Sequence, residues 1–137
     1  MSVLDASAVI ELLLGTELGR VVAERVSDPA TDLHAPHLLD VEVAQVLRRY
    51  VRDGDLAPRE AAAALDNLRA LDVERHGHEA LLDRVWALRD NLTAYDAVYV
   101  ALAEALGTTL LTCDRKLSHA PGMARRIVLV GTAGHGK

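Results

Sequence analysis

The segment 94–106 constrains the fold of this chain more than any other. It is apolar on nearly every face of a helix, and its only charged side chains are Asp96 and Glu104. Thr93 can cap the start of such a helix, and Gly107 can end it. Because a helix that is apolar all round is a buried helix, we predict a central helix here, with other elements packed around it.

Asp96 lies one turn into this predicted helix. A buried carboxylate is costly unless it is paired, hydrogen-bonded or bound to a metal. One interpretation is that Asp96 caps the helix N-terminus, where a negative charge is favoured. The other is that it belongs to a cluster of carboxylates that holds a cation. The segment alone leaves both open.

The composition predicts one globular domain with an aliphatic core. Half of the 137 residues are apolar, yet the chain has one Trp, three Tyr and no Phe. No apolar run approaches the ~20 residues of a membrane span, and the N-terminal residues lack the basic start of a signal peptide. The lone cysteine, Cys113, excludes an internal disulfide framework and fits a reducing compartment, so we expect a cytoplasmic protein.

The formal net charge of −5 excludes one class of nucleic-acid binder. A protein that holds nucleic acid through a general basic surface would carry the opposite charge. A nuclease stays open, because an acidic site can approach phosphate through divalent cations.

Hydrophobic periodicity predicts strands that alternate with helices along most of the chain. Such alternation is typical of a mainly parallel sheet between helical layers, a three-layer α/β/α domain. The residues 115–123 are predicted to form a short helix or a loop. The predicted strands are 2–4, 33–35, 72–74, 109–113 and 127–130, and the predicted helices are 6–14, 16–26, 37–52, 59–71, 78–89 and 94–106.

Carboxylates recur at the boundaries of these elements. Asp5 and Asp114 each follow an apolar strand, and ligands of such sheets gather outside the carboxyl ends of the strands. We therefore expect Asp5 and Asp114 to project into the same crevice as Asp96. Asp40 and Glu42 lie on opposite edges of the apolar stripe of their helix, and periodicity does not decide which of them faces that crevice.

Several carboxylates in one crevice repel one another unless cations neutralise them. Hard divalent cations such as Mg²⁺ or Mn²⁺ prefer oxygen ligands of this kind. Ser7 and Thr112 lie two residues from Asp5 and Asp114 and can orient them through their hydroxyl groups. A two-metal site of this type activates water and stabilises the leaving oxygen of a phosphodiester.

Four motifs, in order along nearly the whole chain, resemble the PIN domain family. The size of the chain resembles that of VapC-type toxins of bacterial toxin–antitoxin pairs. The resemblance selects Glu42 rather than Asp40 as the second acid. The four motifs are Asp5-Ala-Ser7, the helical segment Glu42-Val-Ala-Gln-Val-Leu-Arg-Arg49, Leu92-Thr-Ala-Tyr-Asp96, and Leu110-Leu-Thr-Cys-Asp114.

The resemblance implies a Mg²⁺- or Mn²⁺-dependent endoribonuclease that is neutralised by a cognate antitoxin protein and is commonly a homodimer. Asp5, Glu42, Asp96 and Asp114 would be both the catalytic residues and the metal ligands. Arg115 and Lys116, next to Asp114, are the best candidates for contacts with RNA phosphate. Two alternatives stay open: a catalytically silent module whose acidic crevice binds a basic peptide, and, less favoured, a receiver-like phosphoacceptor.

The C-terminal residues 131–137 form a segment of their own. They spell G-x-x-x-x-G-K after a strand, as in a phosphate-binding loop, but the required Ser or Thr and the following helix are missing. We therefore expect a nuclease domain over 1–130 and a flexible tail over 131–137.

Other polar and aromatic residues have plainer interpretations. His76-Gly-His78 can bind a transition metal, although a turn is the favoured interpretation. His34 and His37 are expected at the surface or at the rim of the site. Trp86 is expected to pack, and Cys113 to act as a small hydrophobe.

Overall fold

The computed structural model describes residues 1–123 and 125–130. Strands and helices alternate in the described chain, largely as predicted. The strands are β1 (Ser2–Leu4), β2 (Leu33–Pro36), β3 (Val73–His76), β4 (Leu110–Thr112) and β5 (Ile127–Leu129). The helices are α1 (Ala6–Leu14), α2 (Glu17–Arg25), α3 (Leu38–Arg52), α4 (Pro58–Ala70), the 3₁₀ turn η1 (Glu79–Leu81), α5 (Leu82–Ala87), α6 (Ala94–Leu106) and α7 (Arg115–Ser118).

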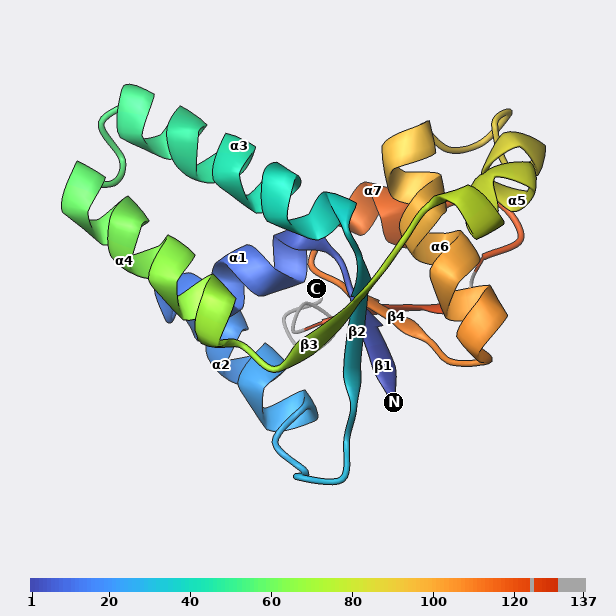
Figure 1. Cartoon of the computed structure of the whole chain (residues 1–137), viewed down its shortest axis with the longest axis horizontal. Coiled ribbons are helices and arrows are strands. Elements are labelled where there is room, and N and C mark those ends of the chain that lie inside the picture. The colour runs from blue at the N-terminus through green and yellow to red at the C-terminus, as the bar shows by residue number, and fades with distance from the viewer. Residues whose placement is uncertain (124, 131–137) are drawn as a thin grey trace.

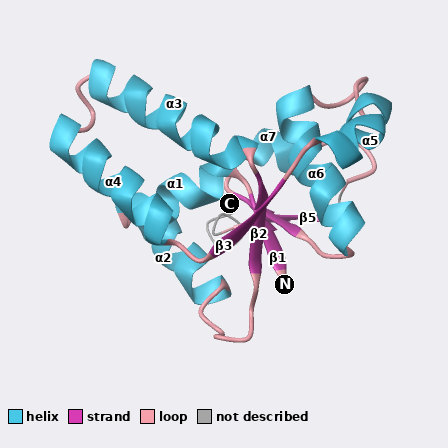
Figure 2. Ribbon diagram, in the orientation of Figure 1, coloured by secondary structure: helices cyan, strands magenta, loops and turns pink. Residues whose placement is uncertain are grey.

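The described strands form one parallel sheet in the order β3-β2-β1-β4-β5. The first strand therefore lies at the centre, and the chain builds outward from it in both directions. Figure 1 shows α1 to α4 on one side of the sheet and α5 and α6 on the other. Figure 2 shows the strands enclosed between these helical layers, which is the predicted α/β/α arrangement.

Helix α6 is the buried helix that the sequence predicts. Every residue from Ala97 to Ala103 is buried, and the helix packs on β1, β2 and β4. The Thr93 hydroxyl accepts a hydrogen bond from the Asp96 backbone N–H at 3.1 Å, and Gly107 ends the helix with φ +68°. Only glycine adopts this backbone conformation without a steric penalty, so both predicted ends are confirmed.

Two predicted elements differ from the structure, and one prediction is not tested by it. The predicted helix 78–89 is divided into the 3₁₀ turn η1 and the shorter helix α5. The predicted strand 33–35 was expected to stop before Pro36, but Pro36 is the last residue of β2, where it is paired with His76 of β3. The predicted tail at 131–137 lies outside the described residues.

The parallel arrangement places the carboxyl ends of the strands at one edge of the sheet. Asp5 follows β1 directly, and Asp114 follows β4, the neighbour of β1, by two residues. Helices α3 and α6, on opposite faces of the sheet, contribute their N-terminal turns to the same region. This topology, rather than sequence proximity, brings the predicted acidic residues together.

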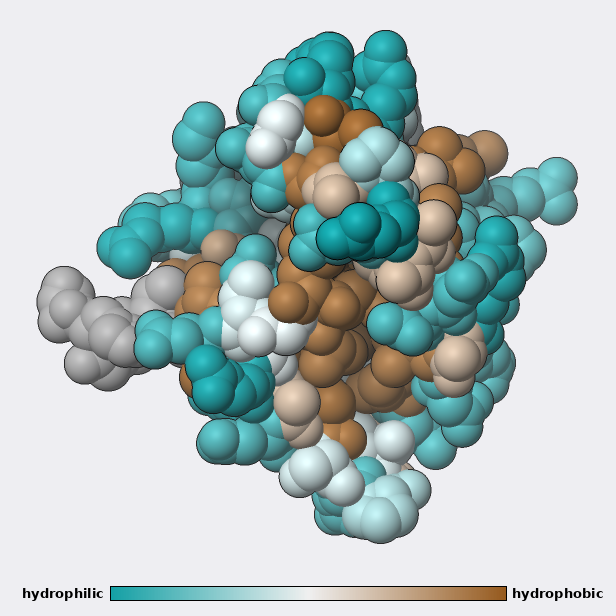
Figure 3. Space-filling view, turned by 90° about the vertical axis from the view of Figure 1, so that its left-hand side faces the viewer, coloured by the Kyte–Doolittle hydropathy of each residue, from teal (hydrophilic) through white to brown (hydrophobic). Residues whose placement is uncertain are grey.

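Helices α3 and α4 form a long hairpin with an apolar groove. The groove has a volume of about 550 Å³. Figure 3 shows the face on this side of the molecule, where a band of apolar surface runs between hydrophilic margins. The groove is lined by Ala44, Leu47, Val51, Pro58, Ala61 and Leu65, with Arg48 and Arg52 at its rim. In the described part of the chain, no helix is long and apolar enough to cross a membrane.

Candidate active site

Asp5 is the most firmly held carboxylate of the site. Its side chain is 6% exposed, and both of its oxygens accept hydrogen bonds. Oδ1 accepts from the Ser7 hydroxyl at 2.7 Å and from the Ala8 backbone N–H at 3.0 Å. Oδ2 accepts from the Thr112 hydroxyl at 2.5 Å. Asp5 therefore caps helix α1 and at the same time joins it to β4.

The predicted roles of Ser7 and Thr112 correspond to observed contacts. The Ser7 oxygen accepts from the Cys113 backbone N–H, and the Thr112 oxygen accepts from the Asp114 backbone N–H, each at 2.9 Å. Each hydroxyl has one proton, and each directs it to Asp5. The two hydroxyls thus orient Asp5 and fix the backbone around Asp114 with the same atoms.

Asp114 begins the short helix α7. Its Oδ1 accepts a hydrogen bond from the Lys116 backbone N–H at 2.9 Å. Asp114 is half-buried, and its charge raises the pKa of Asp5. Arg115 and Lys116 are both exposed beside it, so both predicted RNA-contact residues are accessible at the edge of the site.

Glu42 is held by a residue that sequence reasoning missed. The phenol of Tyr99, from helix α6, donates a hydrogen bond to Glu42 Oε1 at 2.5 Å. Tyr99 is 1% exposed, so its hydroxyl has little access to any other partner. A tyrosine in the apolar middle of a predicted buried helix was the available signal, because a buried phenol needs a hydrogen-bond partner.

Asp96 occupies the first turn of α6 and is half-buried. The residue that caps the backbone of this helix is Thr93, so the helix does not need the Asp96 carboxylate as its main cap. The carboxylate still lies near a helix N-terminus, where a negative charge is favoured. Burial and the charge of Asp114 nevertheless raise its pKa, whereas the Thr93 hydroxyl lowers it.

The four carboxylates influence one another electrostatically. Burial, followed by the charge of Asp114, raises the pKa of Asp5, although the Ser7, Thr112 and Ala8 donors oppose the shift. Burial also raises the pKa of Glu42, and the charges of Asp96 and Asp5 add to this effect against the Tyr99 hydrogen bond. The structure therefore brings all four predicted acids into one cluster.

This cluster has the donor set of a divalent-cation site. Among the described residues, none of its four carboxylates takes part in an ion pair with a basic side chain. Half-buried, mutually repelling oxygen donors without a counter-charge suit a hard cation such as Mg²⁺ or Mn²⁺. The residues present thus fit such an ion.

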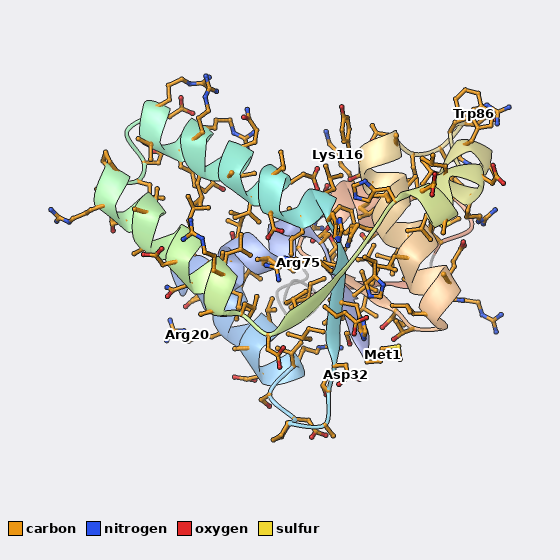
Figure 4. All side chains as sticks on the ribbon, viewed as in Figure 1. Met1, Arg20, Asp32, Arg75, Trp86 and Lys116 are labelled. Atoms are coloured by element: carbon orange, nitrogen blue, oxygen red, sulfur yellow. The ribbon has the colours of Figure 1, made fainter. Side chains whose placement is uncertain are left out.

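Asp40 is excluded from the cluster by its own partner. Arg75 of β3 donates hydrogen bonds to both carboxylate oxygens of Asp40, at 2.8 to 3.1 Å. Figure 4 shows Arg75 in the space between β3 and the α3–α4 hairpin. Arg75 comes from a different strand, so the periodicity of α3 could not indicate the ion pair that distinguishes Asp40 from Glu42.

Two expectations about single residues are wrong. Trp86 is 68% exposed and projects outward from α5, with the Arg89 guanidinium 4.7 Å from its ring centroid. His34 was expected at the surface or at the rim of the site, but it is only 6% exposed, because β2 lies between β1 and β3 in the sheet. Cys113 behaves as predicted: burial raises the pKa of its thiol to about 12, which disfavours the reactive thiolate.

The chain is similar to a known protein family and to several of its members. The family model described as "PIN domain" matches residues 2–123. Ribonuclease VapC1 of Mycobacterium tuberculosis is 43% identical over 129 residues, which cover 93% of this chain and 96% of that protein. Ribonuclease VapC9 of the same organism is 44% identical over 120 residues, which cover 86% of this chain and 89% of that protein.

Solved structures show the same fold. PAE2754 from Pyrobaculum aerophilum matches with a TM-score of 0.62 and 26% identity, covering 85% of this chain and 76% of that one. VapC20 of Mycobacterium tuberculosis, described as a sarcin-ricin loop cleaving toxin, matches with a TM-score of 0.65 and 15% identity, covering 86% and 93%.

The chain therefore belongs to the PIN domain family. Its relatives over nearly their full length are VapC ribonucleases, so the VapC-type resemblance noted in the sequence is confirmed.

Proposed function

We propose that the protein is a divalent-metal-dependent endoribonuclease that acts as the toxin of a toxin–antitoxin pair. Asp5, Glu42, Asp96 and Asp114 are its catalytic residues and hold the metal. The observation that carries this proposal is the cluster of four carboxylates that lack a basic partner in the described part of the chain, together with relatives that are VapC ribonucleases. A cluster of this kind is electrostatically costly unless cations occupy it.

The surrounding residues prepare the cluster for such a cation. Ser7 and Thr112 hold both oxygens of Asp5, and Tyr99 holds one oxygen of Glu42. These contacts restrict the carboxylates to few orientations. The entropic cost of ordering them when a cation binds is therefore smaller. When bound there, Mg²⁺ or Mn²⁺ would supply the positive charge that activates water and stabilises the leaving oxygen of a phosphodiester.

The substrate must approach a site that is itself negative. Without cations, the four carboxylates repel an RNA phosphate. RNA binding is therefore coupled to the binding of metal ions. Arg115 and Lys116 are exposed next to Asp114 and can contact phosphate oxygens beside the scissile bond. Choice among RNAs depends on unpaired bases and loop shape, which these two residues do not read.

A protein partner follows from the same charge distribution. An acidic crevice on a chain of net charge −5 attracts a cationic segment, which an antitoxin can supply. A basic side chain inserted among the carboxylates would take the place of the metal and inhibit cleavage. We further propose that the protein is a homodimer.

The decisive experiment pairs two substitutions of similar chemistry. Asp96→Asn alters the cluster, whereas Asp40→Asn removes an acid of α3 that pairs with Arg75 outside the cluster. Purified wild type should cleave RNA from a cell extract with Mn²⁺ or Mg²⁺, and a chelator should abolish this activity. Asp96→Asn should reduce cleavage by roughly 100-fold or more, whereas Asp40→Asn should keep it.

Two outcomes would contradict the proposal. Wild-type cleavage and a wild-type Mn²⁺-induced rise in melting temperature in Asp96→Asn would remove Asp96 from the site. Metal-independent binding of a basic peptide without any cleavage would instead support a silent interaction module.

Growth of cells tests the biological role. Expression of the wild type alone should arrest growth, and co-expression of the cognate antitoxin should restore it. Expression of Asp96→Asn to the same level should be tolerated. Normal growth under strong expression of intact wild type would contradict the toxin role.

A further inference from the structure

A second group of metal-ligand side chains lies on strands β2 and β3, away from the four carboxylates. It consists of His34, Glu74 and His76, each of which offers one ligand atom, and these atoms all lie within 4.8 Å of one another. His34 pairs with Glu74 in the parallel register, so both side chains lie on the same face of the sheet. His76, two residues further along β3, lies on that face as well.

The two histidines face each other directly. His34 Nδ1 and His76 Nε2 are 2.9 Å apart, and the Glu74 carboxylate is 3.7 Å from the same His76 nitrogen. His34 is 6% exposed, and its other ring nitrogen, Nε2, has no hydrogen-bond partner among the described residues. The two nitrogens that face each other share one proton, and a cation bound to both lone pairs would take its place.

We propose that His34, Glu74 and His76 form a binding site for a borderline divalent cation of the Zn²⁺ class. Imidazole nitrogens and a carboxylate suit Zn²⁺ at about 2.0–2.2 Å, so two ligand atoms on one ion are at most about 4.2 Å apart. The His34–His76 and His76–Glu74 separations of 2.9 and 3.7 Å lie within this limit, and all three ligand atoms lie within 4.8 Å of one another. Glu74 is exposed and can rotate to shorten the widest of them.

This site differs from the carboxylate cluster in its donor atoms and therefore in the metal ions that it favours. Nitrogen ligands favour Zn²⁺, Co²⁺ or Ni²⁺, whereas the all-oxygen cluster favours Mg²⁺ or Mn²⁺. The three protein ligands, one of them the exposed carboxylate of Glu74, leave a fourth coordination position for solvent. A cation here would join the edge strand β3 to β2 through side chains and so stabilise the edge of the sheet.

His78, which the pattern His76-Gly-His78 suggests as a second metal ligand, is not part of this group. The His78 Nε2 accepts a hydrogen bond from the Leu38 backbone N–H at 3.0 Å, at the start of α3. This nitrogen is therefore engaged in the fold. The second imidazole of the site comes instead from His34, 42 residues away, through strand pairing.

Metal titration of the chelator-treated full chain tests the proposal. Zn²⁺ affinity is measured by competition with a chromophoric chelator, and Co²⁺ is added as a spectroscopic probe of coordination. The variants are His76→Gln and Glu74→Gln. The matched controls are His119→Gln and Glu79→Gln, two exposed residues outside the group. All are made in the Asp96→Asn background, so that the carboxylate cluster contributes less.

We expect Zn²⁺ to bind about tenfold more weakly, or worse, in both variants and within about twofold of the parent in both controls. Co²⁺ should give the intense visible absorption of a four-coordinate site, and each variant should reduce it. Glu74 is exposed, so Glu74→Gln keeps the test valid even if His76→Gln does not fold. Unchanged Zn²⁺ affinity in Glu74→Gln, or loss of Zn²⁺ binding through Asp96→Asn alone, would overturn the proposal.

Discussion

Helix α3 carries two carboxylates, two residues apart, in opposite electrostatic situations. Asp40 faces Arg75, whose guanidinium contacts both of its oxygens. Glu42 faces the neutral phenol of Tyr99, and its pKa is raised by burial and by the charges of Asp96 and Asp5. The protein thus supplies the counter-charge for one acid and leaves the other without one. This difference fits a structural role for Asp40 and the metal-binding role that we propose for Glu42.

Replacing Glu42 or Asp40 by its amide should give the largest difference between the two residues, measured as RNA cleavage. We expect Glu42→Gln to reduce metal-dependent RNA cleavage by roughly 100-fold or more, because it removes a charged metal ligand. Asp40→Asn should keep cleavage within about threefold of the wild type. Single-turnover cleavage at saturating Mn²⁺ measures both. Equal losses of RNA cleavage in the two variants would contradict the different roles of Asp40 and Glu42.

Tyr99→Phe tests whether the neutral partner of Glu42 orients it. The substitution removes one hydrogen bond and keeps the buried ring, so the fold should persist. We expect cleavage to fall about tenfold and Mn²⁺ to bind more weakly, because the free carboxylate loses its fixed orientation. Calorimetric Mn²⁺ titration distinguishes this effect from a loss of stability. Wild-type Mn²⁺ affinity would show that Tyr99 only packs.

The pH dependence of stability should reveal the uncompensated charges. The folded protein raises the pKa values of Asp5, Glu42 and Asp96 above their ordinary values of 3.8 and 4.5. The folded state therefore holds protons that the unfolded state has already released. Their stabilising contribution is complete below the ordinary pKa values and is lost as the pH rises through the raised ones.

We accordingly expect the metal-free protein to lose stability from about pH 4 upward, and Glu42→Gln to lose less. Mn²⁺ should reverse the trend, because it binds the deprotonated carboxylates. Urea unfolding across this range, with and without Mn²⁺, measures both effects. A pH dependence in Glu42→Gln identical to that of the wild type would contradict the assignment.

The smallest effect should come from breaking the Asp40–Arg75 pair. Both side chains are partly exposed, so solvent screens their attraction. We expect Asp40→Asn to lower the free energy of unfolding by about 1 kcal/mol or less, with no change in the Mn²⁺-induced shift. Thermal and urea unfolding with and without Mn²⁺ measure both the free energy of unfolding and the Mn²⁺-induced shift. A reduced Mn²⁺ shift would place Asp40 in the site after all.

Much of the site could be predicted from the sequence because its acids lie at element boundaries. Asp5 and Asp114 follow apolar strands, and Asp96 interrupts an apolar helix, so each is conspicuous locally. The hydroxyls of Ser7 and Thr112 lie close enough along the chain to Asp5 and Asp114 to be suspected. The Tyr99–Glu42 contact spans 57 residues and joins helices on opposite faces of the sheet, and no local pattern indicates it.

The aromatic and imidazole residues were harder to place. Trp86 was expected to pack because its helix has an apolar stripe, but the predicted helix 78–89 is divided and the shorter α5 exposes the indole. His34 was expected at the surface or at the rim of the site, but it is buried because β2 is flanked by β1 and β3. In both cases the error concerns position within the fold, not the type of local structure.

By itself, the sequence determined the alternation of strands and helices, the buried helix α6 with its ends at Thr93 and Gly107, and the acids at the carboxyl ends of strands. These features follow from hydrophobic periodicity and capping, which act over a few residues. Only the tertiary structure decided which charges meet. Arg75 reaches Asp40, Tyr99 reaches Glu42, and His34 meets His76, because strand order and helix packing bring distant segments within hydrogen-bond distance. Such contacts depend on topology, which a local pattern does not encode.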